Sequence, residues 1–102
     1  MKKHWTANRP DWDHGIKTVG TVGTAEQLPA LVVPDGFELV VRALPDNTAD
    51  IYLGKSKAKA ESAADRVTFS KGNGLTLKVN NANLVWVDAA VINEGVDYWV
   101  ET

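Results

Sequence analysis

Short apolar segments separated by turn residues run along this chain from Ile16 to Val100. Several of them alternate apolar and polar residues with a period of two, which is typical of a strand with one face in a core. Leu75–Val79 has the clearest alternation, whereas Phe37–Leu44 and Leu84–Val91 are apolar on both faces, which predicts central strands. Seven or eight such strands at regular spacing predict an all-β fold, an antiparallel β-sandwich that is jelly-roll-like.

Turn residues separate the predicted strands. Pro34–Gly36 combines a proline that presets φ with a glycine that accepts positive φ, and Lys71–Gly74 predicts a hairpin. Pro29 predicts an edge or irregular position for its segment, and Val67 and Phe69 are expected to face inward. The predicted strands cover residues 16–22, 27–33, 37–44, 50–54, 66–70, 75–79, 84–91 and 96–101.

Residues 55–65 are the one ambiguous segment. Their alanine, lysine and glutamate residues favour a helix, and Ser56 is a suitable N-cap. The segment has no large apolar face, so we predict a surface loop with one helical turn. A packed helix over 56–64 would instead make the fold α+β.

The first fifteen residues differ from the rest in being polar and aperiodic. We therefore divide the chain into an extended N-terminal arm, 1–15, and a β-sandwich domain, 16–102. The arm carries Trp5 and Trp12, which have a large area to bury and no apolar neighbours in sequence. The arm is thus expected to bind a neighbouring protein through Trp5, Arg9, Trp12 and His14, the alternative being that it folds back on its own domain.

Composition narrows the classes of function. The 102 residues fit one domain and include no cysteine, which rules out disulfides and favours synthesis in a reducing cytoplasm. The net charge of −2 is unlike that of a nucleic-acid-binding protein. Nucleic acid is therefore not an expected partner. No secretory signal or membrane-spanning segment is recognisable, so a membrane is not an expected partner either.

No catalytic residue, cofactor site or metal site is predicted. The two histidines, His4 and His14, lie in the arm, where a catalytic geometry is hard to preorganise. Asp11, Asp13 and His14 could bind a divalent ion, but no second cluster completes a site. The protein is therefore not expected to be an enzyme.

Asp88 and the lysines at 55, 57 and 59 are charged residues for which we predict structural roles. Asp88 stands inside an apolar strand, so its side chain needs Arg42 or a backbone donor as a partner. The alternating lysines 55, 57 and 59 are read as a solvated surface in a chain of net negative charge.

Three aromatic residues of the domain are candidate interface residues: Tyr52, Trp86 and Trp99. Tryptophan and tyrosine are enriched at subunit interfaces, and the alternative is a platform that stacks on sugar rings.

The chain from Val22 to Glu101 resembles the small β-sandwich virion proteins of tailed bacteriophages. Lys71–Gly74 departs from the usual plan, which has proline and glycine before the following strand. The similarity lies in packing and turn motifs, namely Gly23–Leu28, Pro34–Leu44, Asp50–Ser56, Phe69–Gly72 with Leu75–Val79, Leu84–Ala90 and Glu94–Tyr98.

The resemblance implies a structural component of the virion, made in the host cytoplasm. Its most specific form is a capsid decoration (cement) protein that self-associates, with a homotrimer favoured, and bridges subunits of the major capsid protein or another virion protein. The alternative is a tail-associated receptor-binding or carbohydrate-binding module.

Overall fold

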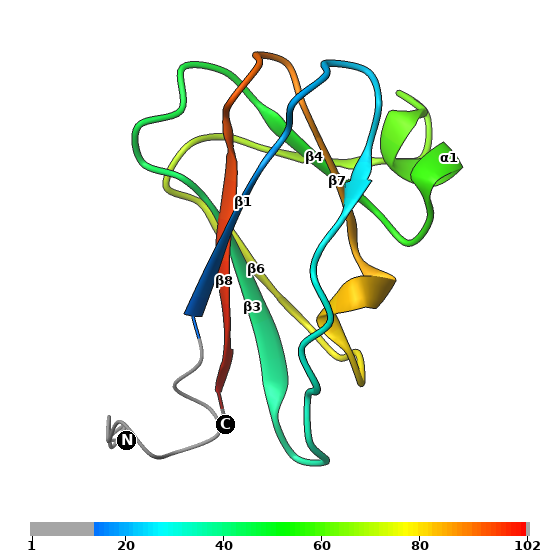
Figure 1. Cartoon of the computed structure of the whole chain (residues 1–102), viewed down its shortest axis with the longest axis vertical. Helices are drawn as coiled ribbons and strands as arrows, with labels where there is room; N and C mark the ends of the chain where they lie inside the picture. Colours follow the sequence, from blue (N-terminus) through cyan, green and yellow to red (C-terminus); the bar gives the residue numbers. More distant parts are fainter. Residues whose placement is uncertain (1–13, 102) are drawn as a thin grey trace.

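The computed structural model describes residues 14–101, which form two antiparallel four-stranded sheets packed face to face. The first sheet, sheet A, has the strand order β1-β8-β3-β6, and the second, sheet B, has the order β2-β7-β4-β5 (Figure 1). The predicted all-β sandwich is therefore confirmed. The elements are β1 His14–Thr18, β2 Glu26–Gln27, β3 Glu38–Ala43, β4 Ile51–Gly54, α1 Lys57–Glu61, β5 Val67–Phe69, β6 Gly74–Leu77, the 3-10 helix η2 Ala82–Leu84, β7 Trp86–Ala89 and β8 Gly95–Glu101.

The core lies between the sheets and follows the predicted alternation. Each strand turns every second side chain inward, because successive side chains of a strand point to opposite faces. The two strands predicted to be central, β3 and β7, are both interior strands of their sheets. The buried inner-face residues include Leu39, Val41 and Ala43 of β3, Ile51 and Leu53 of β4, Val87 and Ala89 of β7, and Val96, Tyr98 and Val100 of β8.

Two predicted strands at the N-terminal end have different bounds in the structure. β1 begins at His14, two residues before the predicted strand, because residues 14–18 pair in register with β8. His14 and Gly15 therefore belong to sheet A, whereas the sequence pattern assigns both to the N-terminal arm. β2 ends at Gln27, and Val32 forms only an isolated bridge with Asn81. Pro29, which lacks an N–H, stands between these two pairings.

The connection between β5 and β6 corrects the predicted hairpin. β5 belongs to sheet B and β6 to sheet A, so residues 70–73 cross from one sheet to the other. Gly72 has a φ of +78°, as the turn chemistry requires, but a tight turn suits a crossing as well as a hairpin. Among the described strands, only β4 and β5 are consecutive in the chain and neighbours in one sheet.

Val67 and Phe69 both face inward as predicted, but Val67 is 48% exposed, whereas Phe69 is buried. Val67 pairs with Leu53 and so belongs to the inner face. β5 is the edge strand of its sheet, however, so no further strand among residues 14–101 lies beyond it.

The segment after β4 forms a single helical turn on the outer face of sheet B. Ser56 caps α1 by accepting a hydrogen bond from the Lys59 N–H at 3.2 Å. Ala60 is fully buried against Gly54, where a Cβ would lie 2.3 Å from the Ala60 nitrogen. The predicted loop with one helical turn is thus observed, and its packing depends on the glycine beneath it.

Replacing Ser56 with alanine should lower the free energy of unfolding by about 1 kcal/mol, because the first turn of α1 loses its capping acceptor. Urea unfolding at 25 °C measures the change. Ser62→Ala is the matched control, because Ser62 caps the other end with its backbone N–H, which alanine retains. Equal losses in the two variants would contradict a capping role for Ser56.

The two open sides of the sandwich differ. On one side, Lys17 of β1 donates to Glu26 of β2 at 2.7 Å, which ties the edge strands of the two sheets together. The hydrogen bond from Lys17, together with one from the Gly20 N–H, lowers the pKa of Glu26. The other side, between β5 and β6, is lined by apolar side chains.

Candidate protein-binding surface

A cluster of polar and aromatic side chains lies on the outer face of sheet A. Strand pairing places Arg42 of β3 and Ile16 of β1 on either side of Asp97 in β8. The next outward-facing position of β8 is Trp99, which is opposite His14. We call this set, His14, Ile16, Arg42, Asp97 and Trp99, the β8 surface.

Asp97 is the centre of the β8 surface. The Arg42 Nε donates to Asp97 Oδ1 at 3.0 Å, and the Arg42 Nη2 donates to Oδ2. His14 Nε2 lies 3.2 Å from the same Oδ2. The Asp97 side chain is 3% exposed, so its charge is held by partners from both neighbouring strands.

The electrostatics of Asp97 follow from this arrangement. Burial raises the pKa of Asp97, but the hydrogen bonds from Arg42 and His14 outweigh burial, so the pKa lies below its ordinary value. Asp97 is therefore a carboxylate at neutral pH. It joins β1, β8 and β3 and thereby fixes the positions of Arg42 and His14.

Trp99 presents an aromatic ring beside these charges. The Arg42 guanidinium carbon lies 5.5 Å from the centroid of the Trp99 ring, and the His14 ring centroid lies 6.0 Å from it. The Trp99 Nε1 donates to Glu101 at 2.8 Å. Ile16, on the neighbouring strand, is 61% exposed. The β8 surface thus combines an arginine, a tryptophan and an exposed aliphatic side chain.

The predicted site residues are divided among different parts of the molecule. Trp5, Arg9 and Trp12 lie outside the described residues, whereas His14 is the first residue of β1. Trp99 lies on the outer face of sheet A, and Tyr52 and Trp86 lie on the outer face of sheet B. The three domain aromatics therefore do not share one face.

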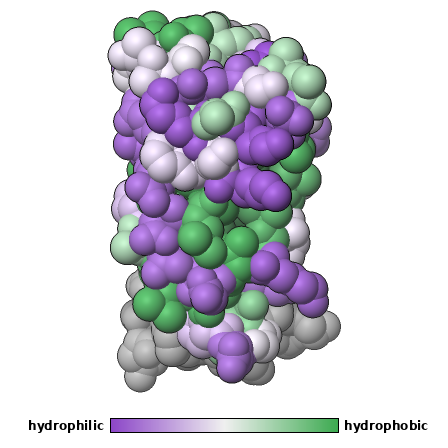
Figure 2. Space-filling model, turned by 90° about the vertical axis from the view of Figure 1, so that its right-hand side faces the viewer, coloured by the Kyte–Doolittle hydropathy of each residue, from purple (hydrophilic) through white to green (hydrophobic). Residues whose placement is uncertain are grey.

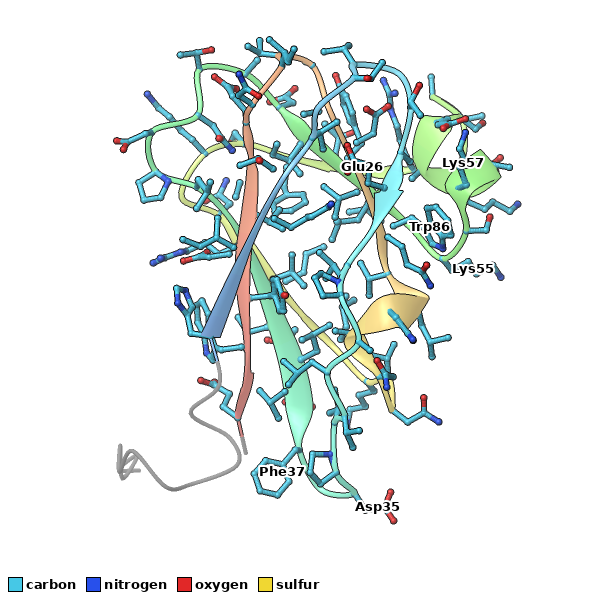
Figure 3. All side chains as sticks on the ribbon, in the orientation of Figure 1. Glu26, Asp35, Phe37, Lys55, Lys57 and Trp86 are labelled. Atoms are coloured by element: carbon cyan, nitrogen blue, oxygen red, sulfur yellow. The ribbon has the colours of Figure 1, made fainter. Side chains whose placement is uncertain are left out.

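The two aromatics of sheet B have neighbours of their own. The Arg66 guanidinium carbon lies 3.5 Å from the centroid of the Tyr52 ring. Trp86 lies on the side of the molecule that carries Lys55 and Lys57 (Figure 3). Lys57 is paired with Glu61 at 2.6 Å, and Lys59 lies 3.7 Å from Asp65.

Asp88 has backbone donors as its partners, which was one of the two predicted alternatives. Its Oδ1 accepts from the Gly23 N–H at 3.0 Å and from the Ala89 N–H at 2.8 Å. Arg42, the other candidate, lies on the opposite sheet and pairs with Asp97. Asp88 thus holds the β1–β2 loop against β7.

Sequence reasoning did not identify Asp97 as the centre of a cluster. A signal was present, because the alternation that turns Val96, Tyr98 and Val100 inward places Asp97 and Trp99 together on the other face. The alternation in β3 likewise places Arg42 outward. That β3 and β8 are neighbours in register could not be known from either segment alone.

Two further observations concern the part of the chain that the structure describes. No group of three or more histidine, cysteine, aspartate or glutamate side chains is placed to hold a metal ion within residues 14–101. Within the same residues, no helix is long and apolar enough to cross a membrane.

Comparison with known proteins found no matching family model, no matching curated protein and no matching solved structure.

Proposed function

We propose that this protein is a structural, non-enzymatic component of a virus particle, most specifically a capsid decoration protein that self-associates and bridges capsid subunits. The observation that carries the proposal is the β8 surface, because it places Trp99, Arg42 and the exposed Ile16 side by side. Arginine and tryptophan are enriched at protein interfaces and among the residues that dominate their binding energy.

The β8 surface is suited to a partner because its charged groups are already positioned. Asp97 holds Arg42 through two hydrogen bonds, so the guanidinium loses less side-chain entropy when a partner covers it. Residues 1–13, with Trp5, Arg9 and Trp12, join the sheet at His14, which belongs to the same surface. A partner could therefore contact the β8 surface and the preceding residues together.

The order of the strands supports the resemblance to virion proteins. We infer a jelly-roll winding, because nearly every pair of consecutive described strands is divided between the two sheets, with β4 and β5 as the exception. A cyclic homotrimer is the assembly we propose, because it gives each N-terminal segment a neighbouring protomer to contact.

Native mass spectrometry of the full chain tests self-association, with Trp99→Ala as the diagnostic variant. We expect a trimer for the wild type and an association constant reduced about 30-fold in the variant, the loss typical of a tryptophan central to an interface. Trp86→Ala is the matched control, because Trp86 is a half-buried tryptophan on the opposite sheet. A monomer at all concentrations, or equal effects of the two variants, would overturn the proposed interface.

Binding to shells tests the decoration role itself. The full chain should sediment together with empty heads of the phage that encodes it and raise the temperature at which those heads open. Binding to a glycan array without binding to heads would favour the tail-associated module instead.

A further inference from the structure

The open side of the sandwich between β5 and β6 carries an apolar groove of about 170 Å³. Lys55 is the one charged residue among the described residues that line it. Val67 and Leu84 are each about half exposed there, at 48% and 49%. The apolar lining includes Leu53, Val67, Leu75, Leu77, Val79 and Leu84.

Core side chains line this groove, and no other residue within 14–101 covers them. Leu75 and Leu77 of β6 and the following Val79 pack against the core, and Leu53 of β4 belongs to the core. On the opposite side of the sandwich, the Lys17–Glu26 pair joins the two edge strands. Hydrophobic side chains also gather in a patch on the side of the molecule that carries η2, the helix that ends at Leu84 (Figure 2). Covering such apolar area is favourable in proportion to the area removed from water.

The size and chemistry of the groove fit one aromatic ring. An apolar cavity of about 150 Å³ is large enough to bind benzene. Outside the described residues, the chain offers two aromatic side chains of this kind, Trp5 and Trp12. We propose that the groove receives Trp5 of a second copy of this chain, an inference that rests on the proposed self-association and identifies its docking site.

Chain length favours Trp5 over Trp12. An extended chain spans at most about 3.3–3.6 Å per residue. Trp12 precedes β1 by two positions and therefore stays within about 7 Å of the β1 edge, whereas Trp5 precedes it by nine and reaches about 30 Å. β6 is the third strand from β1 in its sheet, which corresponds to about 14 Å. Trp5 can therefore reach the groove of its own molecule or that of a neighbour, and the proposed self-association favours the neighbour's groove.

One carboxylate near the groove, that of Asp35, complements the charge of the segment around Trp5. A depression of about 500 Å³ shares Val79 with the groove and is lined by Asp35 and by Glu38, which pairs with Lys78 at 3.4 Å. Asp35 and the adjacent Phe37 lie at the lower end of the molecule (Figure 3). Residues 1–10 contain Lys2, Lys3 and Arg9 and no aspartate or glutamate. A basic segment that enters the groove from this end would pass the Asp35 carboxylate.

Disulfide trapping in the full chain tests the proposal, because the chain has no cysteine of its own. Thr6→Cys, beside Trp5, is mixed with a separate Leu84→Cys protein under mild oxidation. We expect a disulfide-linked heterodimer, identified by the mass of the linked peptides. Ile92→Cys is the matched control, because Ile92 is an apolar residue of similar exposure, 55%, in the loop between β7 and β8. Equal yields with Leu84→Cys and Ile92→Cys would overturn the proposal.

A double variant separates a neighbour's groove from the chain's own. If Thr6→Cys and Leu84→Cys in one chain form only an internal disulfide, Trp5 fills its own groove and the proposal is wrong. Trp5→Ala should weaken self-association about 30-fold, as should Leu84→Lys, and Ile92→Lys should not. A wild-type oligomer without trapping at Leu84 would overturn this inference alone, whereas a wild-type monomer would overturn the proposed self-association as well.

Discussion

Replacing Gly95 with alanine should lower the free energy of unfolding by more than about 3 kcal/mol, because the new methyl group has no space. A Cβ at Gly95 would lie 1.9 Å from the Lys17 carbonyl oxygen and 2.7 Å from the Thr18 Cα. Both are backbone atoms of β1, so relief of the clash requires the paired strand to move. Urea unfolding, or the yield of folded protein if the variant is too unstable, measures the loss.

A second set of contacts makes Gly95 hard to displace. The buried Asn47 donates from Nδ2 to the Gly95 carbonyl at 2.8 Å and accepts from the Gly95 N–H at 3.3 Å. Gly20→Ala is the matched control, because the only atom near its Cβ is a flexible carboxylate oxygen of Glu26 at 3.7 Å. The control should change stability by less than about 0.5 kcal/mol. Equal effects at the two glycines would contradict the close approach of β1 and β8.

Removal of Arg42 is expected to have the second largest effect. Arg42→Ala leaves the Asp97 carboxylate buried with His14 as its remaining side-chain partner among the described contacts. Loss of one member of a buried ion pair costs about 3–5 kcal/mol, and since Arg42 itself is 40% exposed we expect about 2–3 kcal/mol at pH 7. Lys57→Ala, which breaks the exposed pair with Glu61, should leave the free energy of unfolding almost unchanged.

The pH dependence of this loss follows from the lowered pKa of Asp97. A carboxyl group whose pKa is lower in the folded state stabilises the fold above its unfolded pKa, about 3.9. That stabilisation disappears as the pH falls through the folded pKa. The wild type should therefore lose stability below about pH 4, and the difference between wild type and Arg42→Ala should shrink there. A difference that stays constant from pH 7 to pH 3 would show that Arg42 acts through packing alone.

Much of the fold could be predicted from local pattern. The period of two correctly assigned the inner faces of β3, β4 and β8, because a side chain's face depends only on its position along its own strand. Ser56 was recognised as a cap for the same reason, since capping involves residues three positions apart. The roles of Trp5, Arg9 and Trp12 stay predictions.

The candidate surface could be predicted only in part. Trp99 and His14 were singled out as separate features, one as an interface aromatic and the other as part of an arm, and the structure places them on paired positions of β8 and β1. The carboxylate that holds His14 is Asp97, which local pattern did not distinguish from the other aspartates of the strands. A partner 83 positions away along the chain leaves no local signal.

Alternation and turn chemistry specify short antiparallel strands around an apolar core, because both act within a few residues. Which strands are neighbours depends instead on contacts between segments far apart in the chain. The turn at Gly72 has the same backbone requirement whether it closes a hairpin or crosses between sheets, so the division of β5 and β6 between sheets is set by packing. That division exposes Val67 and leaves the apolar groove, while the pairing of β3 with β8 brings Arg42 to Asp97.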